Sequence, residues 1–191
     1  DVNLTLVHVE ADTGRNTVIT VMSENAISYS DNVFRYFNEK GKEDSLRTTP
    51  SLSLIYNGKK LTSYTDNDIL IPDGEITFID NNGDNVFDVI LSYNYENYYV
   101  EAVNASSYTV VDGKSDVTST RKLILDPDEK IVRIFDDSGA LSDFSAISTD
   151  TVITVFRSAD DSYAEVYTYG SVTEAVIKAI SIENGNKTIV T

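Results

Sequence analysis

Turn-forming residues recur about every ten residues along this chain, and short runs rich in Val, Ile, Thr, Tyr and Phe lie between them. Such runs are typical of strands, and their spacing is typical of all-β barrels and sandwiches. The pair Asn57-Gly58 in "LSLIYNGKKL" favours a type I′ turn, which needs positive φ at both positions. The sequence therefore predicts an all-β protein of two linked small β-barrel or β-sandwich units built from hairpins.

The division between these units is predicted at "YTDNDILIPDGE", Tyr64 to Glu75, which concentrates Asp, Asn, Pro and Gly between strand-like runs. Pro72 lies in this stretch and cannot donate a hydrogen bond to a central ladder. We therefore expect residues 1–68 to form an N-terminal β unit and residues 69–191 to form a C-terminal β unit.

The C-terminal part holds two further patterns. The segment Ser171–Ser181 fits either a strand or a short helix with a capping box of Ser171 and Glu174. The stretch "IKAISIENGNKTIVT" at the end resembles "VHVEADTGRNTVITV" near the start. This weak repeat indicates either a piece of a tandem array or terminal strands that complete neighbouring barrels.

Composition narrows the function. The chain has 31 acidic and 15 basic residues, a net charge of −16, and no Lys/Arg cluster that could bind phosphates, which argues against nucleic acid as a partner. No apolar run approaches the ~20 residues that a membrane span needs. The absence of Cys excludes disulfides, thiolate zinc sites and cysteine nucleophiles, and it fits exported proteins of Gram-positive bacteria. A single histidine, His8, cannot build a multi-histidine metal site.

A candidate calcium loop lies in "FIDNNGDNVFD". An EF-hand loop uses side chains at positions 1, 3 and 5, a backbone carbonyl at position 7 and often a water-mediated contact at position 9. Position by position, the chain supplies Asp80, Asn82, Asp84, Val86 and Asp88.

Two positions of this loop differ from the EF-hand pattern. Asn85 stands where an EF-hand has Gly, and Leu91 stands where it has the bidentate Glu. The run that follows, "VFDVILSY", is strand-like rather than helical. Two readings therefore stay open: a weak Ca²⁺ site, or a hairpin loop whose Asp and Asn side chains cap their own backbone amides.

Other candidate sites are weaker. Tyr93, Tyr95, Tyr98 and Tyr99 in "YNYENYY" suggest a sugar-stacking or protein-contact surface, although aromatic residues are favoured in strands in any case. Further acidic groups lie between strand signals, where surface turns are the better interpretation. The chain has no nucleophile elbow, phosphate loop or metalloprotease helix motif, so we predict that it is not an enzyme.

The stretch from Leu54 to Asn104 resembles a segment of Gram-positive cell-surface proteins that carry S-layer homology domains. The resemblance rests on the "YNG" hairpin, the run "DGEITFIDNNGDNVFDVI" and the strand "YYVEAV". It implies an exported, envelope-associated protein built from β modules and retained by separate helical anchoring domains, which are absent from this chain. It implies no catalytic residues.

Taken together, these observations predict a non-catalytic structural or adhesive module of a secreted, cell-envelope-associated bacterial protein. Its expected location is the cell surface, and its expected partners are envelope proteins, a cell-wall polymer and neighbouring domains of a larger parent protein. The alternative is a calcium- or glycan-binding accessory module of a secreted enzyme. An exposed aromatic groove would favour this alternative.

Overall fold

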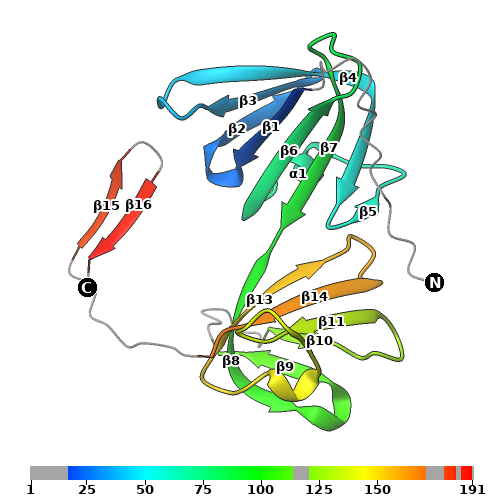
Figure 1. The fold of residues 1–191 in the computed structure, drawn as a ribbon, viewed down its shortest axis with the longest axis vertical. Coiled ribbons are helices and arrows are strands. Elements are labelled where there is room, and N and C mark those ends of the chain that lie inside the picture. The colour runs from blue at the N-terminus through cyan, green and yellow to red at the C-terminus, as the bar shows by residue number, and fades with distance from the viewer. Residues whose placement is uncertain (1–16, 114–120, 171–178, 184–185, 191) are drawn as a thin grey trace. The chain divides into compact units, whose positions relative to one another are not determined.

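The computed structural model of the protein describes residues 17–113, 121–170, 179–183 and 186–190 (Figure 1). The chain divides into two compact units, Asp1–Asn94 with Ala175–Thr191, and Tyr95–Glu174. Each unit contains a mixed sheet of seven strands. The prediction of an all-β fold in two units is confirmed.

The sheet of the first unit has the order β1-β6-β7-β4-β3-β2, with β5 paired to β4. All its neighbouring pairs are antiparallel except β4 and β7, which are parallel. Its strands are β1 (Thr17–Met22), β2 (Ala26–Ser30), β3 (Val33–Phe37), β4 (Glu43–Tyr56), β5 (Lys59–Lys60), β6 (Gly74–Asp80) and β7 (Phe87–Asn94), with a one-turn helix α1 (Asp66–Ile69) before β6.

The core of the first unit comes from the period of two along its strands. On β6, Ile76 and Phe78 are fully buried while Glu75 is exposed, because successive side chains point to opposite faces. The ring of Phe78 lies 4.7 Å from that of Phe34 and 5.9 Å from that of Phe87, measured between ring centroids. Each such buried aromatic or aliphatic side chain contributes roughly 1.5–3 kcal/mol of burial energy.

The division between the units differs from the sequence-based boundary at Asp68, because it falls between Asn94 and Tyr95. The stretch that resembles a linker lies inside the first unit. Thr65 and Asp68 form the capping box of α1, and Ile69 and Ile71 are buried in the first core. Polar residues that mark a linker in the sequence therefore cap a helical turn here, and the apolar residues beside them hold it to the sheet.

The sheet of the second unit has the order β10-β9-β8-β13-β14-β11-β12, and only β11 and β14 are parallel. Its core contains Tyr98, Val100, Ile153, Val155 and Val166, which come from three neighbouring strands. The strands are β8 (Glu96–Asn104), β9 (Thr109–Asp112), β10 (Lys122–Ile124), β11 (Ile131–Phe135), β12 (Leu141–Ser142), β13 (Val152–Arg157) and β14 (Tyr163–Thr168).

The two units share one strand plan. In the first unit, β1 pairs with β6, β6 with β7, β7 in parallel with β4, and β4 with β5. In the second unit, β8 pairs with β13, β13 with β14, β14 in parallel with β11, and β11 with β12. A short helical turn precedes the sixth strand in both, and each turn is followed or ended by a buried isoleucine, Ile69 or Ile147.

The two sheets differ in where their remaining two strands are added. In the first unit the β2–β3 hairpin continues the sheet from β4, whereas in the second unit β9 and β10 continue it from β8. The repeat noticed in the sequence is a different one: it joins the stretch before and including β1 to the C-terminal end. Residues 7–16 of that stretch lie outside the described part of the chain.

The C-terminal end contains a two-stranded antiparallel hairpin of β15 (Ala179–Glu183) and β16 (Asn186–Val190). Ser171–Ser181, which the sequence leaves open between strand and helix, lies mostly outside the described residues, and its described part belongs to β15. Within the described parts of the chain, every helix is too short and too polar to cross a lipid bilayer.

The turn predicted at Asn57-Gly58 is confirmed. The two residues have φ of 44° and 80° and connect β4 to β5. The Asn57 side chain also has a role that the turn rule does not predict. Its Nδ2 donates to the carbonyl of Asn94 (2.9 Å) and its Oδ1 accepts from the Asn94 N–H (2.9 Å). The turn therefore anchors the last residue of β7.

Candidate functional site

The loop predicted to bind calcium is the hairpin connection between β6 and β7. Asp80 is the last residue of β6 and is fully buried. Its Oδ1 accepts hydrogen bonds from the N–H groups of Asn82 (3.2 Å) and Gly83 (2.7 Å), and its Oδ2 accepts one from Asn85 (2.9 Å). One carboxylate thus accepts hydrogen bonds from three backbone N–H groups of the loop. These groups have no partner in the ladder between β6 and β7.

The other predicted ligands repeat this arrangement along the loop. Asn82 Oδ1 accepts from the N–H of Asp84 (2.9 Å), and Asp84 Oδ1 accepts from the N–H of Val86 (2.8 Å). Asp88, already in β7, accepts from the N–H of Asn81 (3.1 Å). Four of the five predicted residues therefore use their side chains to cap backbone amides, and Val86 is one of the donors.

Convergence on one point would be the mark of a calcium site. Among the described residues, no three Asp, Glu or His side chains come together closely enough to hold a metal ion. One oxygen of the loop has no partner: Asn81 Oδ1 is buried and accepts no hydrogen bond. The geometry matches the loop-capping interpretation, and calcium binding stays a prediction.

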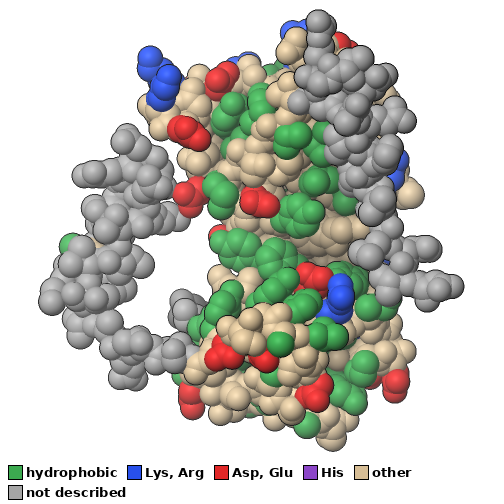
Figure 2. Space-filling model, viewed as in Figure 1, with side chains coloured by type: hydrophobic (Ala, Val, Ile, Leu, Met, Phe, Trp, Pro, Cys, Tyr) green, Lys and Arg blue, Asp and Glu red, His purple; other side chains and the backbone are tan. Residues whose placement is uncertain are grey.

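Capping by Asp and Asn is general in this protein. In each case a side-chain oxygen accepts from the N–H two residues further on, which is the pattern of an Asx turn. Figure 2 shows the acidic side chains spread over the visible face rather than gathered in one patch. Besides the three residues of the β6–β7 loop, the capping residues are Asn38, Asn104, Asp126, Asp136, Asp143 and Asp160.

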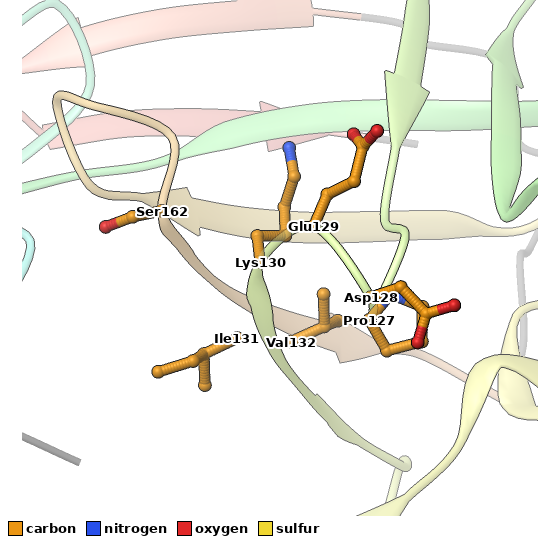
Figure 3. Close-up of a pocket in the computed structure, with 7 residues that line it drawn as sticks. All are labelled: Pro127, Asp128, Glu129, Lys130, Ile131, Val132 and Ser162. Carbon is orange, nitrogen blue, oxygen red and sulfur yellow. The ribbon is translucent and has the colours of Figure 1, made fainter. Parts of the chain in front are cut away.

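A shallow hollow of about 480 Å³ lies on the second unit. It is lined by the segment from Pro127 to Val132 together with Ser162. In Figure 3 the carboxylates of Asp128 and Glu129 point in different directions, so they do not form the facing pair that glycoside hydrolysis uses. The amine of Lys130 is in an ion pair with Asp161. The hollow therefore offers no group of converging side chains.

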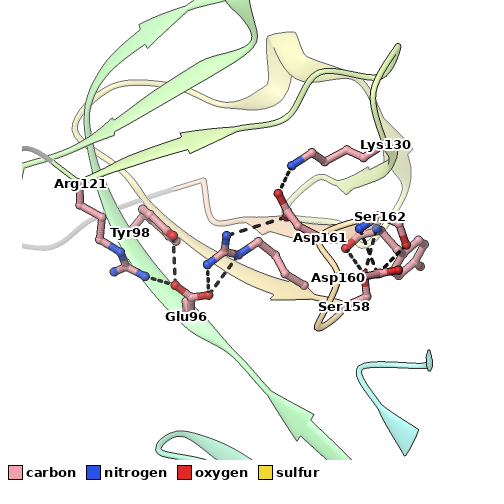
Figure 4. A network of polar contacts seen from close by, with 10 residues as sticks. Glu96, Tyr98, Arg121, Lys130, Ser158, Asp160, Asp161 and Ser162 are labelled. Carbon is pink, nitrogen blue, oxygen red and sulfur yellow. Dashed lines mark hydrogen bonds and ion pairs between the residues drawn. The ribbon is translucent and has the colours of Figure 1, made fainter. Parts of the chain in front are cut away.

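A network of polar side chains joins β8 and β13 in the second unit (Figure 4). Glu96 on β8 accepts from Arg157 Nε on β13 (3.1 Å) and from the Tyr98 hydroxyl (3.1 Å). Arg121 forms a second ion pair with Glu96 and lies over the ring of Tyr98, 3.9 Å from its centroid. The sequence did not reveal this network, because Glu96 and Arg157 are 61 positions apart.

The environment of Glu96 sets its protonation. Burial favours the neutral acid, but the hydrogen bonds and positive charges of Arg157, Tyr98 and Arg121 outweigh burial and hold the pKa of Glu96 below its usual 4.5. In the second unit, burial and a hydrogen bond to Glu165 raise the pKa of Tyr163 to about 12. Both groups therefore keep one charge state at neutral pH and act as structural partners.

This depressed pKa predicts a pH dependence of stability. The ionised Glu96 stabilises the fold above pH 4.5, and that contribution is lost as the pH falls through its lower folded-state pKa. We expect Glu96→Gln to lower the free energy of unfolding at pH 7 by at most about 1 kcal/mol, because the pair is partly exposed and screened. The difference should shrink as the pH falls from 7 to 3, as measured by urea denaturation.

The matched control for this substitution is Glu43→Gln, which removes the exposed Arg35–Glu43 pair at 3.4 Å. Its urea midpoint should stay close to that of the wild type at both pH values. An unchanged difference between Glu96→Gln and the wild type at pH 3 and pH 7 would contradict the assignment.

The tyrosine-rich stretch does not form one surface. Tyr98 is buried in the second core, whereas Tyr93 on β7 is exposed. Tyr95 packs against Phe156, with ring centroids 6.0 Å apart, and the Tyr99 hydroxyl donates to Asp150 (3.0 Å). The four rings therefore have separate environments, in agreement with the interpretation that strand preference explains them.

Comparison with known proteins adds no assignment. The chain matches no protein-family model, and no curated protein and no solved structure is significantly similar to it. The resemblance to S-layer-associated proteins stays a sequence-based prediction, and functional assignment rests on the chain's own residues.

Proposed function

We infer that the chain is a non-catalytic structural or adhesive module of a secreted bacterial protein associated with the cell envelope. The observation that supports this most is the use of its acidic side chains. Those of the β6–β7 loop and of four further turns cap backbone amides, and Glu96 and Asp161 are in ion pairs. Such contacts stabilise loops and strand ends, which is what a structural module needs.

The envelope location is supported by different observations. The stretch from Leu54 to Asn104 carries the motifs of the resemblance, and the chain contains no Cys. The net charge of −16 makes copies of the domain repel one another and disfavours polyanions as partners. Envelope proteins or a cell-wall polymer, together with neighbouring domains of the same protein, are the partners that we propose.

The location can be tested on intact cells of the bacterium that encodes the chain. An antibody raised against the 191-residue chain should label unbroken cells, and brief protease treatment of those cells should remove the label. An antibody against a cytoplasmic enzyme serves as the control for lysis. Labelling that appears only after the cells are broken would contradict an envelope-associated module.

Calcium binding at the β6–β7 loop is the second candidate function. It is favoured by the buried Asn81 Oδ1, which has no hydrogen-bond partner, in a loop that also carries the carboxylates of Asp80 and Asp84. We expect weak binding, with a dissociation constant of about 10⁻⁴–10⁻³ M, as in extracellular modules. Millimolar Ca²⁺ should then raise the melting temperature of the wild type, because a ligand that binds only the folded state stabilises it.

The variant Asp84→Ala is suited to this test, since Asp84 is exposed and its loss leaves one amide without its cap. We expect Asp84→Ala to abolish the calcium shift with little change in the calcium-free melting temperature. No heat in a calorimetric titration and no melting shift for the wild type would remove calcium binding as a candidate.

A further inference from the structure

In each seven-stranded sheet, the first and the last strand along the chain flank one middle strand. β1 and β7 lie on either side of β6, and β8 and β14 lie on either side of β13. Both neighbours are antiparallel to the middle strand, so the entering and leaving strands run in the same direction. Figure 1 shows this arrangement for β1, β6 and β7.

The registers place the entry and the exit at opposite ends of the middle strand. In the first unit, Thr17 of β1 lies opposite Asp80, whereas Asn94 of β7 lies opposite Gly74, at the other end of β6. Tension applied through the chain therefore pulls β1 and β7 in opposite directions along their own axes.

The second unit has the same strand directions, but its entry and exit lie only two residues apart along β13. Glu96 of β8 lies opposite Val155, whereas Thr168 of β14 lies opposite Ile153, which is nearer the start of β13. The chain enters and leaves this unit on parallel strands as well. Two sheets whose entering and leaving strands run in the same direction thus follow one another along the sequence.

The direction of the force relative to the strands decides how the ladder hydrogen bonds resist extension. Bonds between antiparallel strands are perpendicular to the strands, so a force along the strands loads all bonds of a ladder together. A force across the strands would break them one after another. The β1–β6 ladder has six residue pairs and the β6–β7 ladder also has six, whereas the β8–β13 and β13–β14 ladders have four and five.

The junction between the two loaded ladders is short and is held from both sides. Only Tyr95 separates β7 from β8. On one side, Asn94 makes two hydrogen bonds with the turn residue Asn57. On the other side, the Tyr95 ring packs on Phe156 and Glu96 pairs with the guanidinium of Arg157. Tension that leaves β7 therefore enters β8 with no slack segment between them.

We propose that the chain is a tension-bearing element, in which each unit resists extension through a pair of ladders loaded in shear. This function goes beyond an envelope location and does not depend on it. Such an element needs a covalent or tightly bound attachment at each end of the chain. Backbone hydrogen bonds then carry the tension.

The absence of Cys makes a direct experiment possible, because two introduced cysteines are the only attachment points for handles in single-molecule force spectroscopy. The shear variant is Thr17→Cys with Tyr93→Cys, at exposed positions near the entry of β1 and the exit of β7. The peeling variant is Met22→Cys with Glu75→Cys, which lie opposite each other on β1 and β6 and are also exposed.

We expect the shear variant to unfold at a several-fold higher force than the peeling variant at the same loading rate. Forced unfolding reports the unfolding barrier along the pulled direction, so the two variants of one sheet can differ although their stabilities agree. The length released in each event, at roughly 3.5 Å per residue, identifies the segment that opened. Urea denaturation of both variants, kept reduced, checks that both are folded.

A second shear pair, Asn97→Cys with Tyr169→Cys, tests the second unit at exposed positions. It should also unfold at a higher force than the peeling variant. Equal forces for shear and peeling in folded variants would overturn the proposal, whatever the cellular location proves to be. Surface labelling without mechanical resistance would leave the envelope assignment standing and remove this function.

Discussion

Replacing Gly74 with Ala is expected to lower the free energy of unfolding of the first unit by roughly 3–5 kcal/mol. Gly74 begins β6 with a φ of +134°, which side chains other than Gly rarely adopt. A Cβ at this position would lie 1.8 Å from the carbonyl oxygen of Tyr93 and 2.9 Å from its carbonyl carbon. Both are backbone atoms of the neighbouring strand, so β6 and β7 would have to separate there.

The matched control is Gly58→Ala in the same unit. Gly58 has a φ of +80°, and a Cβ there would have no atom within 4 Å. This substitution therefore carries the backbone strain without the clash, and it should cost about 1–2 kcal/mol. Urea denaturation followed by circular dichroism measures both. Equal losses for Gly58→Ala and Gly74→Ala would show that the close approach of β6 and β7 is absent.

Asp80→Ala should be the most damaging change in the β6–β7 loop. It leaves the N–H groups of Asn82, Gly83 and Asn85 without their acceptor. Asp80 itself is fully buried. Hydrogen bonds to charged groups contribute roughly 1.5–3 kcal/mol each, and water can replace part of them in a partly exposed loop. We expect a loss of roughly 3–5 kcal/mol, which is a large share of the stability of a small domain.

Asp84→Ala is the control within the same loop, because Asp84 is exposed and caps one amide. It should cost about 1 kcal/mol or less. Both variants are to be compared by urea denaturation in the presence of EDTA, so that only capping contributes. Similar losses for Asp80→Ala and Asp84→Ala would contradict the view that Asp80 organises the loop.

Local patterns in the sequence were sufficient for much of the fold. The alternation of apolar and polar residues predicted the strands, and Asn57-Gly58 predicted its turn, because both depend on neighbours in sequence. The loop after Asp80 was predicted as a hairpin for the same reason. Its ambiguity between calcium binding and capping came from chemistry, since both uses favour Asp and Asn oxygens at alternate positions.

Contacts between distant residues could not be predicted in this way. The boundary was placed at Asp68 because Asp, Asn and Pro mark linkers, yet Ile69 and Ile71 bury that stretch in the first core. The pairing of Glu96 with Arg157 depends on which strands become neighbours, and no local rule fixes that. The parallel ladders have the same cause, because β4 and β7 pair across two intervening strands and a helix.

Two units with the same strand pairing follow each other along the chain, each with a parallel ladder at the same place. Cysteine cross-linking tests this in the full chain, which has no Cys of its own. The pairs Ser53→Cys/Val89→Cys and Arg133→Cys/Glu165→Cys lie in register on β4–β7 and β11–β14. Neighbouring strands lie about 4.8 Å apart, within the Cα separation that a disulfide allows.

The matched controls shift one partner by two residues along the same strand face: Ser53→Cys/Leu91→Cys and Arg133→Cys/Tyr167→Cys. Their Cα atoms should be roughly 7–8 Å apart, too far for a disulfide without backbone movement. Mild oxidation followed by mass spectrometry of the peptides should show a disulfide in both in-register variants and free thiols in both controls. An in-register pair that stays reduced, or a shifted pair that oxidises, would contradict the shared strand plan.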